Sequence, residues 1–290
     1  MRDKIIKKLS NQNKKFYFLT GDLGFKTFDI LKDKLKKMFI NIGVAEQNMI
    51  NVATGLTVSK FPVIVYSIVN FATFRCLEQI RNNIAYENLN IKIISNGAGF
   101  SYGALGFTHH GIEDIAIIKS LPNITILTPT YLDQLNKIIN YLLYSKRPVY
   151  LRLDTKFLNK DKTLNYKLNN KTKYVFISTG TITEKIEKFI KNERLNEKSS
   201  IITPLNLKDL ERIYPKKNKM KFFIVEEHRE DYGLTSEYIK ILSKRFSNAS
   251  IFKFGLNIKD PHLIGNREFL LNKNGLNEKK LFLFFRKNLY

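Results

Sequence analysis

Short runs of apolar residues alternate with longer amphipathic segments along most of this chain. Runs of this length are typical of strands that are buried on both faces, and their alternation with helices predicts parallel sheets covered by helices. We therefore expect an α/β fold. The predicted strands are residues 15–20, 62–67, 91–95, 124–127, 148–153, 174–180, 200–202 and 222–225. The predicted helices are residues 45–56, 71–86, 131–144, 183–191, 235–246 and 274–290.

A polar stretch rich in Asn and Lys interrupts this alternation. It covers residues 156–173 and shows neither a helical nor a strand period. A chain of 290 residues is long enough for two hydrophobic cores. We therefore expect two α/β domains, residues 1–155 and a smaller one at residues 174–290, joined by a linker at 156–173.

The net charge of +23 raises the question of a nucleic acid or membrane partner. Residues 41–150 hold 8 basic and 6 acidic residues, so the excess lies outside the region with the most structured pattern. The outer lysines are mixed with Asn, Ile and Glu, which is typical of solvated surface. We expect no nucleic acid or membrane partner. The charged N-terminus and the lone Cys76, which excludes a disulfide, favour a cytoplasmic protein.

Glu46 stands at the start of an apolar-periodic run that predicts a helix, with Gly43 in the preceding turn. A carboxylate at this position often only complements the helix dipole. Two further polar groups follow predicted strands: a turn with Asp22 and Leu23, and the pair His109 and His110 after a glycine-rich loop. Adjacent histidines after such a loop favour a functional site. A metal site is not expected there, because neighbouring side chains diverge and no third ligand has a usual spacing.

Several motifs together carry a family resemblance. They are Gly43-Val44-Ala45-Glu46-Gln47-Asn48-Met49, Glu78-Gln79-Ile80-Arg81-Asn82, Thr108-His109-His110-Gly111-Ile112-Glu113-Asp114, Leu121-Pro122-Asn123 and Glu226-Glu227-His228. Residues 43–154 resemble the pyrimidine-binding domain of transketolases, and the whole chain resembles the C-terminal subunit of a split, two-subunit transketolase. The resemblance implies a parallel-sheet pyrimidine-binding domain followed by a smaller transketolase C-terminal domain.

The resemblance implies a thiamine diphosphate enzyme that moves a two-carbon ketol unit between sugars. In this family Glu46 corresponds to the carboxylate that hydrogen-bonds the aminopyrimidine ring and relays a proton. Phe71, or else Phe74, corresponds to the aromatic platform under that ring. His109 corresponds to the active-site histidine, with His110 secondary. Asp22 and Leu23 match the turn that borders the cofactor across the subunit interface.

Three departures from the family pattern concern the substrate. Leu105 stands where classical transketolases have an acidic residue, and Gly97 replaces a phosphate-binding histidine. Thr155 stands near the place of a phosphate-binding arginine, for which Arg152 and Lys156 are candidate substitutes. We therefore expect a deoxygenated or otherwise modified sugar in place of the usual sugar phosphates.

The Gly-Asp-Gly motif that holds the cofactor diphosphate and its Mg²⁺ in this family is absent. The resemblance thus implies an N-terminal diphosphate-binding partner subunit that holds Mg²⁺, in an α₂β₂ assembly. Two alternatives remain open. One is decarboxylative carboligation, as in deoxyxylulose phosphate synthases, or a 2-oxoacid dehydrogenase β subunit, which share the architecture. The other is a catalytically silent scaffold subunit.

Overall fold

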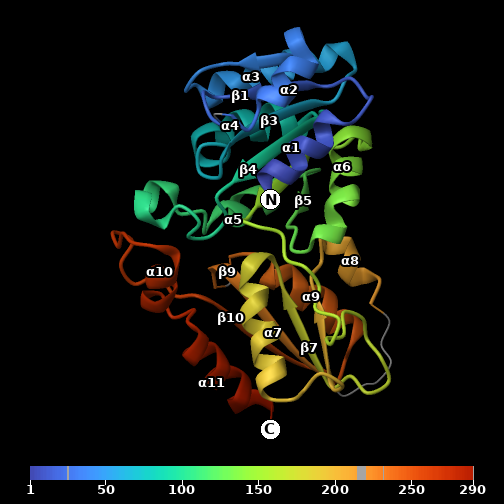
Figure 1. Ribbon diagram of the computed structural model, residues 1–290, viewed down its shortest axis with the longest axis vertical. Coiled ribbons are helices and arrows are strands. Elements are labelled where there is room, and N and C mark those ends of the chain that lie inside the picture. Colours follow the sequence, from blue (N-terminus) through green and yellow to red (C-terminus); the bar gives the residue numbers. More distant parts are fainter. Residues whose placement is uncertain (25, 214–219, 231, 290) are drawn as a thin grey trace.

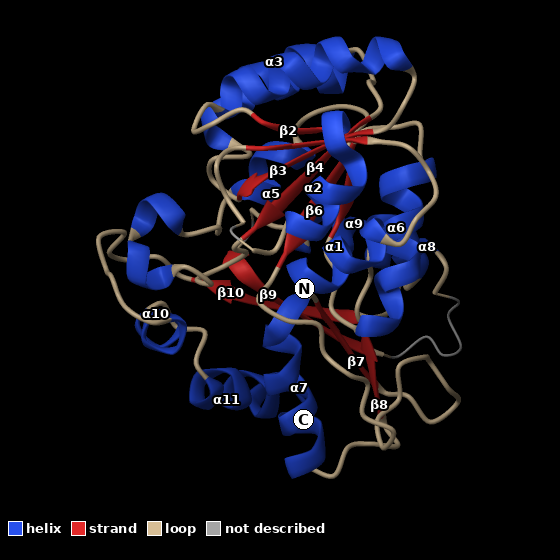
Figure 2. Ribbon diagram, turned by 45° about the horizontal axis from the view of Figure 1, so that its top comes forward, coloured by secondary structure: helices blue, strands red, loops and turns tan. Residues whose placement is uncertain are grey.

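The computed structural model describes residues 1–24, 26–213, 220–230 and 232–289. In this part of the chain, strands form two separate parallel sheets, each covered by helices on both faces (Figures 1 and 2). The N-terminal half of the sequence builds one sheet and the C-terminal half builds the other (Figure 1). The predicted α/β class is confirmed. None of the helices in the described ranges is long and apolar enough to cross a bilayer.

The first sheet has six strands among the described residues, in the order β2-β1-β3-β4-β6-β5. All of its neighbouring strands run parallel. Its strands are β1 (Tyr17–Thr20), β2 (Phe39–Asn41), β3 (Val63–Ile68), β4 (Ile91–Asn96), β5 (Thr125–Leu127) and β6 (Val149–Leu153). Ligands of open parallel sheets bind at the carboxyl ends of the strands, so this edge is where a site is expected.

Side chains alternate between two cores on opposite faces of the first sheet. In β3, Val63 and Val65 pack toward α3 and α5, whereas Ile64 and Tyr66 pack toward α1, α2 and α6. The helices are α1 (Arg2–Ser10), α2 (Asp29–Leu35), α3 (Glu46–Leu56), α4 (Leu77–Gln79), α5 (Asp114–Lys119) and α6 (Leu135–Tyr144), and a π-helical segment (Ile80–Tyr86) follows α4. This two-sided burial is the reason why these strands appear in the sequence as unbroken apolar runs.

The second sheet has four strands in the described ranges, in the order β10-β9-β7-β8, and it is also parallel. Its strands are β7 (Tyr174–Ser178), β8 (Ser199–Ile202), β9 (Lys221–Arg229) and β10 (Ser250–Leu256). Its helices are α7 (Thr183–Asn192), α8 (Leu207–Glu211), α9 (Thr235–Arg245), α10 (Arg267–Lys273) and α11 (Glu278–Leu289). One core on this sheet is continuous with a core of the first sheet, so the two layers pack as one body.

Residues 156–173 contain no helix or strand, but they do not form a loose tether. Phe157, Leu158 and Leu164 are buried. The backbone N–H of Leu158 donates to the carbonyl oxygen of Thr130 over 2.8 Å. The segment predicted as a linker is therefore packed along the body of the protein, and the domain limits stay a prediction.

Candidate active site

Glu46 lies at the point where the strand order of the first sheet reverses. From β1 the chain moves to β2 on one side and then to β3 on the other, which makes the crevice between β1 and β3 the topological switch point. Glu46 begins α3 at this crevice, and its side chain is 1% exposed. The hydroxyl of Ser67, near the end of β3, donates to its Oε1 over 3.0 Å. A fully buried carboxylate at this position is more than a complement to the helix dipole.

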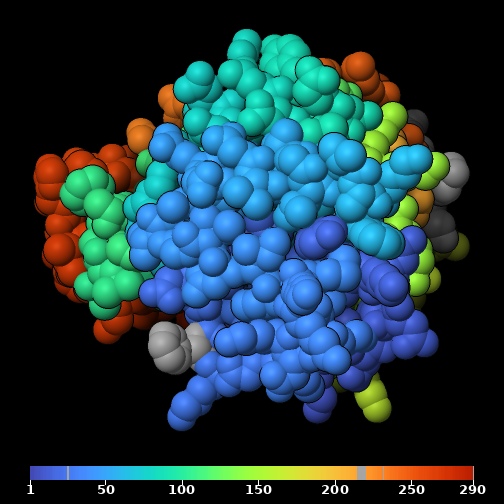
Figure 3. Space-filling view, turned by 90° about the horizontal axis from the view of Figure 1, so that it is seen from above, coloured from blue at the N-terminus to red at the C-terminus, as the bar shows by residue number. Residues whose placement is uncertain are grey.

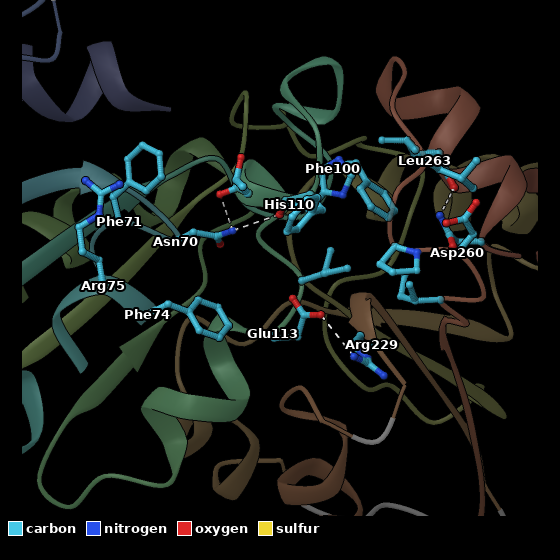
Figure 4. A pocket seen from close by; sticks show the side chains of 17 residues that line it. Asn70, Phe71, Phe74, Arg75, Phe100, His110, Glu113, Arg229, Asp260 and Leu263 are labelled. Atoms are coloured by element: carbon cyan, nitrogen blue, oxygen red, sulfur yellow. Dashed lines mark hydrogen bonds and ion pairs between the residues drawn. The ribbon is translucent and has the colours of Figure 1, made fainter. Parts of the chain in front are cut away.

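Arg75 provides the second partner of Glu46. Its Nη1 donates to Oε2 of the carboxylate over 2.5 Å. Its guanidinium carbon also lies 4.2 Å from the centroid of the Phe71 ring, and Figure 4 shows the two side chains next to each other. The sequence motifs did not point to Arg75. The signal that could have found it is its position four residues after the predicted aromatic platform.

A cavity of about 660 Å³ opens next to residues 70–75, between the two sheets (Figure 4). Phe74, which is 47% exposed, lines it, and its far wall comes from residues 258–274 of the C-terminal half. Glu113 and Arg229 both line the cavity and form an ion pair at 3.4 Å. Burial raises the pKa of Glu113, and Arg229 opposes that shift. Of the two predicted platform residues, Phe71 is the one whose ring lies under the Arg75 guanidinium.

His109 also contacts the Phe71 ring. The two rings meet edge to face, with centroids 5.0 Å apart. Nδ1 of His109 is 3.0 Å from the hydroxyl of Thr108, and Asn70 Nδ2 donates to the Thr108 carbonyl oxygen over 2.8 Å. The structure thus brings Glu46, Phe71 and His109 together around one short segment.

His110 packs within the glycine-rich loop. It is 5% exposed, its Nε2 is 3.3 Å from the Gly103 carbonyl oxygen, and its ring stands edge-on to Phe100. Burial lowers the pKa of His110, and the Gly103 contact opposes that shift only in part. His110 borders the cavity, but it mainly fixes the loop.

Arg152 does not lie where a substrate contact was predicted. Its side chain is 8% exposed, its Nε donates to Asp114 over 3.0 Å, and its Nη2 donates to the Gly111 carbonyl oxygen over 2.6 Å. Tyr150, two residues earlier in β6, also donates to Asp114, over 2.6 Å. The alternation of β6 directs both side chains inward toward α5. The guanidinium is committed to these interior partners, so we withdraw its assignment as a substrate contact.

Sequence reasoning missed a charged cluster that joins the two sheets. Arg267 of α10 donates to both carboxylate oxygens of Asp154, over 2.7 and 3.0 Å, and to Glu227 of β9 over 2.5 Å. Burial alone would raise the pKa of Asp154, but Arg267 and backbone N–H groups hold it well below its usual range. Glu227 also accepts from the Phe100 N–H over 2.8 Å. Gly99 has φ +62°, and a Cβ there would lie 2.2 Å from Glu227 Oε1, so this loop needs glycine.

Asp22 and Leu23 lie in the turn after β1, apart from the cavity. Asp22 has φ +53°, and its N–H donates to the Asn41 side chain over 2.9 Å. The preceding Gly21 passes close to the turn before α3, because a Cβ there would lie 2.8 Å from the Gly43 carbonyl oxygen. The turn therefore lies beside the backbone that leads into Glu46, and Asp22 itself is exposed to solvent.

Two of the three residues that depart from the family pattern, Gly97 and Leu105, lie on the glycine-rich loop, whereas Thr155 follows β6. Leu105 is 57% exposed, and Phe107, 54% exposed, stands edge-on to His262 at 5.7 Å. Seen from above, this loop lies next to the C-terminal segment at one edge of the molecule (Figure 3). Gly97 has φ +106°, and a Cβ there would lie 2.5 Å from the Tyr102 ring. The backbone at position 97 therefore leaves no room for a histidine side chain.

Comparison with known proteins gives consistent matches. The model of the transketolase pyrimidine-binding domain matches residues 3–160. One subunit of an apulose-4-phosphate transketolase from Actinobacillus succinogenes is 27% identical over 252 residues, which cover 82% of this chain and 80% of that protein. A putative transketolase C-terminal section from Methanocaldococcus jannaschii is 31% identical over 232 residues, covering 76% and 73%. A solved structure described as a split gene transketolase, inactive beta4 tetramer, covers 99% of this chain and 96% of its own, with a TM-score of 0.81 at 25% identity.

The family model covers more than half of this chain, and the solved structure matches it almost from end to end. The resemblance inferred from the motifs is thereby confirmed. The chain belongs to the transketolase family, and it corresponds to the C-terminal section of enzymes that divide the transketolase chain between two subunits.

Proposed function

We propose that this chain is the C-terminal subunit of a thiamine diphosphate-dependent enzyme that transfers a two-carbon ketol unit between sugars. The observation that carries the proposal is the buried Glu46 carboxylate at the switch point, which Arg75 links to Phe71, whose ring also contacts His109. An aminopyrimidine has a flat face for Phe71 and ring nitrogens for Glu46. The residues present therefore suit this part of the cofactor.

The protein residues would act mainly on protons. Glu46 would hold a proton at the pyrimidine ring nitrogen and pass it back and forth as a general acid and base. His109 would hold or give a proton at a sugar oxygen. The bound cofactor supplies the carbon nucleophile that breaks and forms the bond next to a ketose carbonyl. Phe71 would orient the ring, because it contacts both Arg75, the partner of Glu46, and His109.

The site is half of a complete one. The sequence lacks the Gly-Asp-Gly motif for the diphosphate. We therefore infer that an N-terminal partner subunit holds the diphosphate and its Mg²⁺, in an α₂β₂ assembly. The relative from Actinobacillus succinogenes is itself named as one subunit of a transketolase, which supports a divided enzyme.

The sugar is proposed to be a non-classical one. The exposed apolar side chain of Leu105 offers no hydrogen bond to a sugar hydroxyl, and Gly97 has no space for a phosphate-binding histidine. The A. succinogenes relative is named for apulose 4-phosphate, which is consistent with a substrate range beyond the usual pentose phosphates. A deoxygenated or otherwise modified sugar suits this loop best.

The test is reconstitution with the partner subunit, thiamine diphosphate and Mg²⁺. Glu46→Gln should keep the fold and lower both ketol transfer and hydrogen–deuterium exchange at the reactive carbon of the cofactor by roughly 100-fold or more. Glu87→Gln, which changes an exposed carboxylate after the π-helical segment, is the matched control and should leave both unchanged. Normal exchange in Glu46→Gln contradicts the assignment.

A panel of ketol donors and acceptors tests the substrate class separately. We expect modified sugars to be turned over faster than xylulose 5-phosphate with ribose 5-phosphate. Leu105→Asp should shift the preference toward the classical pair, because it adds an acceptor for sugar hydroxyls. If the classical pair is the best substrate of the wild-type enzyme, the substrate proposal fails while the Glu46 assignment stands.

A further inference from the structure

The pair formed by Glu46 and Arg75 joins a fixed partner to a movable one. The Glu46 side chain is 1% exposed, whereas that of Arg75 is 39% exposed. Glu46 lies in the first turn of α3 and is held by Ser67 at its other oxygen. The guanidinium can leave by rotation of its own side chain toward solvent, but the carboxylate cannot follow it. An uncompensated charge in this buried position is costly, so the site needs a cationic or hydrogen-bonding partner at all times.

The guanidinium of Arg75, which contacts Glu46 and Phe71, resembles part of an aminopyrimidine in shape and in its N–H donors. It is a planar N–C–N group with N–H donors, and it lies over the Phe71 ring with its carbon 4.2 Å from the centroid. An aminopyrimidine is also planar and contains an N–C–N unit within its ring, and one of these two ring nitrogens, when protonated, is an N–H donor that can face a carboxylate. Both groups would therefore seek the same two features: the flat face of Phe71 and the carboxylate of Glu46.

We propose that Arg75 is a placeholder for the aminopyrimidine ring, which holds Glu46 and covers Phe71 until the cofactor binds and displaces it. This inference rests on the proposed function, because it uses the same carboxylate and the same aromatic ring. In the cofactor-free chain Arg75 neutralises Glu46. In the loaded enzyme the ring takes over this contact, and the guanidinium turns toward the open side of the segment.

A double-mutant cycle tests the proposal. The variants are Arg75→Ala, Glu46→Gln and the double variant, and urea unfolding is measured on the complex with the partner subunit, with and without thiamine diphosphate. Without the cofactor, the double variant should lose clearly less free energy of unfolding than the two single variants lose together. With saturating cofactor this coupling should disappear, since the two side chains no longer touch. Arg75→Gln is a second variant that removes the charge but keeps a shorter polar side chain with an N–H donor.

Equilibrium binding of thiamine diphosphate provides a second measurement. Arg75→Ala should bind the cofactor several-fold more tightly than the wild type, because only the free state loses a contact. The tightening, converted to a free energy, should be at least as large as the coupling measured without cofactor, because Arg75→Ala also removes the contact with Phe71 from the free state. Arg81→Ala is the matched control. Arg81 also lies over an aromatic ring, 4.8 Å from the Tyr86 centroid, but its hydrogen bond goes to exposed Asn82, so its removal should not change binding.

The outcomes separate this inference from the proposed function. If the wild-type complex does not bind thiamine diphosphate, or Glu46→Gln binds and activates it normally, the proposed function fails. If those results are as proposed but Arg75→Ala binds the cofactor more weakly, Arg75 holds the bound cofactor and the placeholder inference is overturned. Coupling that persists at saturating cofactor overturns it as well.

Discussion

Replacing Arg267 with Met should uncouple the two sheets and should cost far more than the loss of an ordinary ion pair. The guanidinium binds Asp154 through two nitrogens and Glu227 through two, and it is 21% exposed. The two carboxylate side chains are only 7% and 5% exposed. Methionine keeps most of the apolar stem, so the substitution mainly removes the charge and leaves two buried carboxylates without their shared cation.

Breaking a buried ion pair in this way costs about 3–5 kcal/mol, and the partial exposure of Arg267 places the expected loss near 3 kcal/mol. Arg286→Met is the matched control. Arg286 binds Glu193 over 2.5 Å, the distance of the Arg267–Glu227 contact, but its side chain is 52% exposed. Water and ions screen that pair, so its loss should cost at most about 1 kcal/mol.

Urea unfolding followed by circular dichroism measures the free energy of unfolding of the wild type and of both variants. Repeating the measurement at several pH values tests the expected direction of the pH dependence. In the wild type the folded pKa of Asp154 lies below its unfolded value, so its stabilisation is present above about pH 4 and is lost as the pH falls. Arg267→Met lacks this contribution. The stability gap between the two proteins should therefore stay nearly constant from pH 7 to about pH 5 and narrow as the pH falls below about 4. Equal losses in Arg267→Met and Arg286→Met, or a gap that widens at low pH, would refute the reasoning.

Two further predictions concern stability. Burial lowers the pKa of His228 to about 4, so below about pH 6.5 the unfolded chain takes up a proton at this residue while the folded chain does not. The free energy of unfolding should therefore fall by roughly 3 kcal/mol between pH 6.5 and pH 4. In His228→Gln the midpoint of urea unfolding should change less with pH over this range. Gly99→Ala should lose about 2 kcal/mol because φ is +62° and Glu227 lies in the way, whereas Gly55→Ala, in α3 with open space around it, should gain about 0.5–1 kcal/mol. Equal effects of the two glycine substitutions would contradict this account.

The central strands were predictable from the sequence, and two edge strands were not. β3, β4 and β6 are buried on both faces and appear as continuous apolar runs. β2 and β10 lie at the edges of their sheets and are largely half-exposed, so their apolar pattern is weak. The helix α1 was also missed, because its buried stripe of Ile5, Ile6 and Leu9 is set among lysines.

The residues of the candidate site likewise fall into those that the sequence predicted and those that it did not. Glu46, Phe71 and His109 lie in local motifs, and the structure places them together. The contacts of Arg75 with Glu46 and of Arg267 with Asp154 join residues 29 and 113 positions apart. No local pattern indicates such contacts, since they depend on how the strand ends converge in space. The same reason explains the mistaken assignment of Arg152, whose position near the end of β6 is apparent from the sequence but whose inward partner, Asp114, is not.

The C-terminal sheet contributes to the site by fixing the loop that carries His109. Glu227 of β9 accepts from the Phe100 N–H at the beginning of this loop, and its carbonyl oxygen accepts from Arg152. Arg152 also holds the Gly111 carbonyl oxygen at the end of the loop. Both ends of the loop are therefore tied to one residue of the second sheet, directly or through Arg152. A change in β9 should thus move His109 relative to Phe71 without touching either residue, which gives the second sheet a positioning role in the reaction that we propose for the edge of the first.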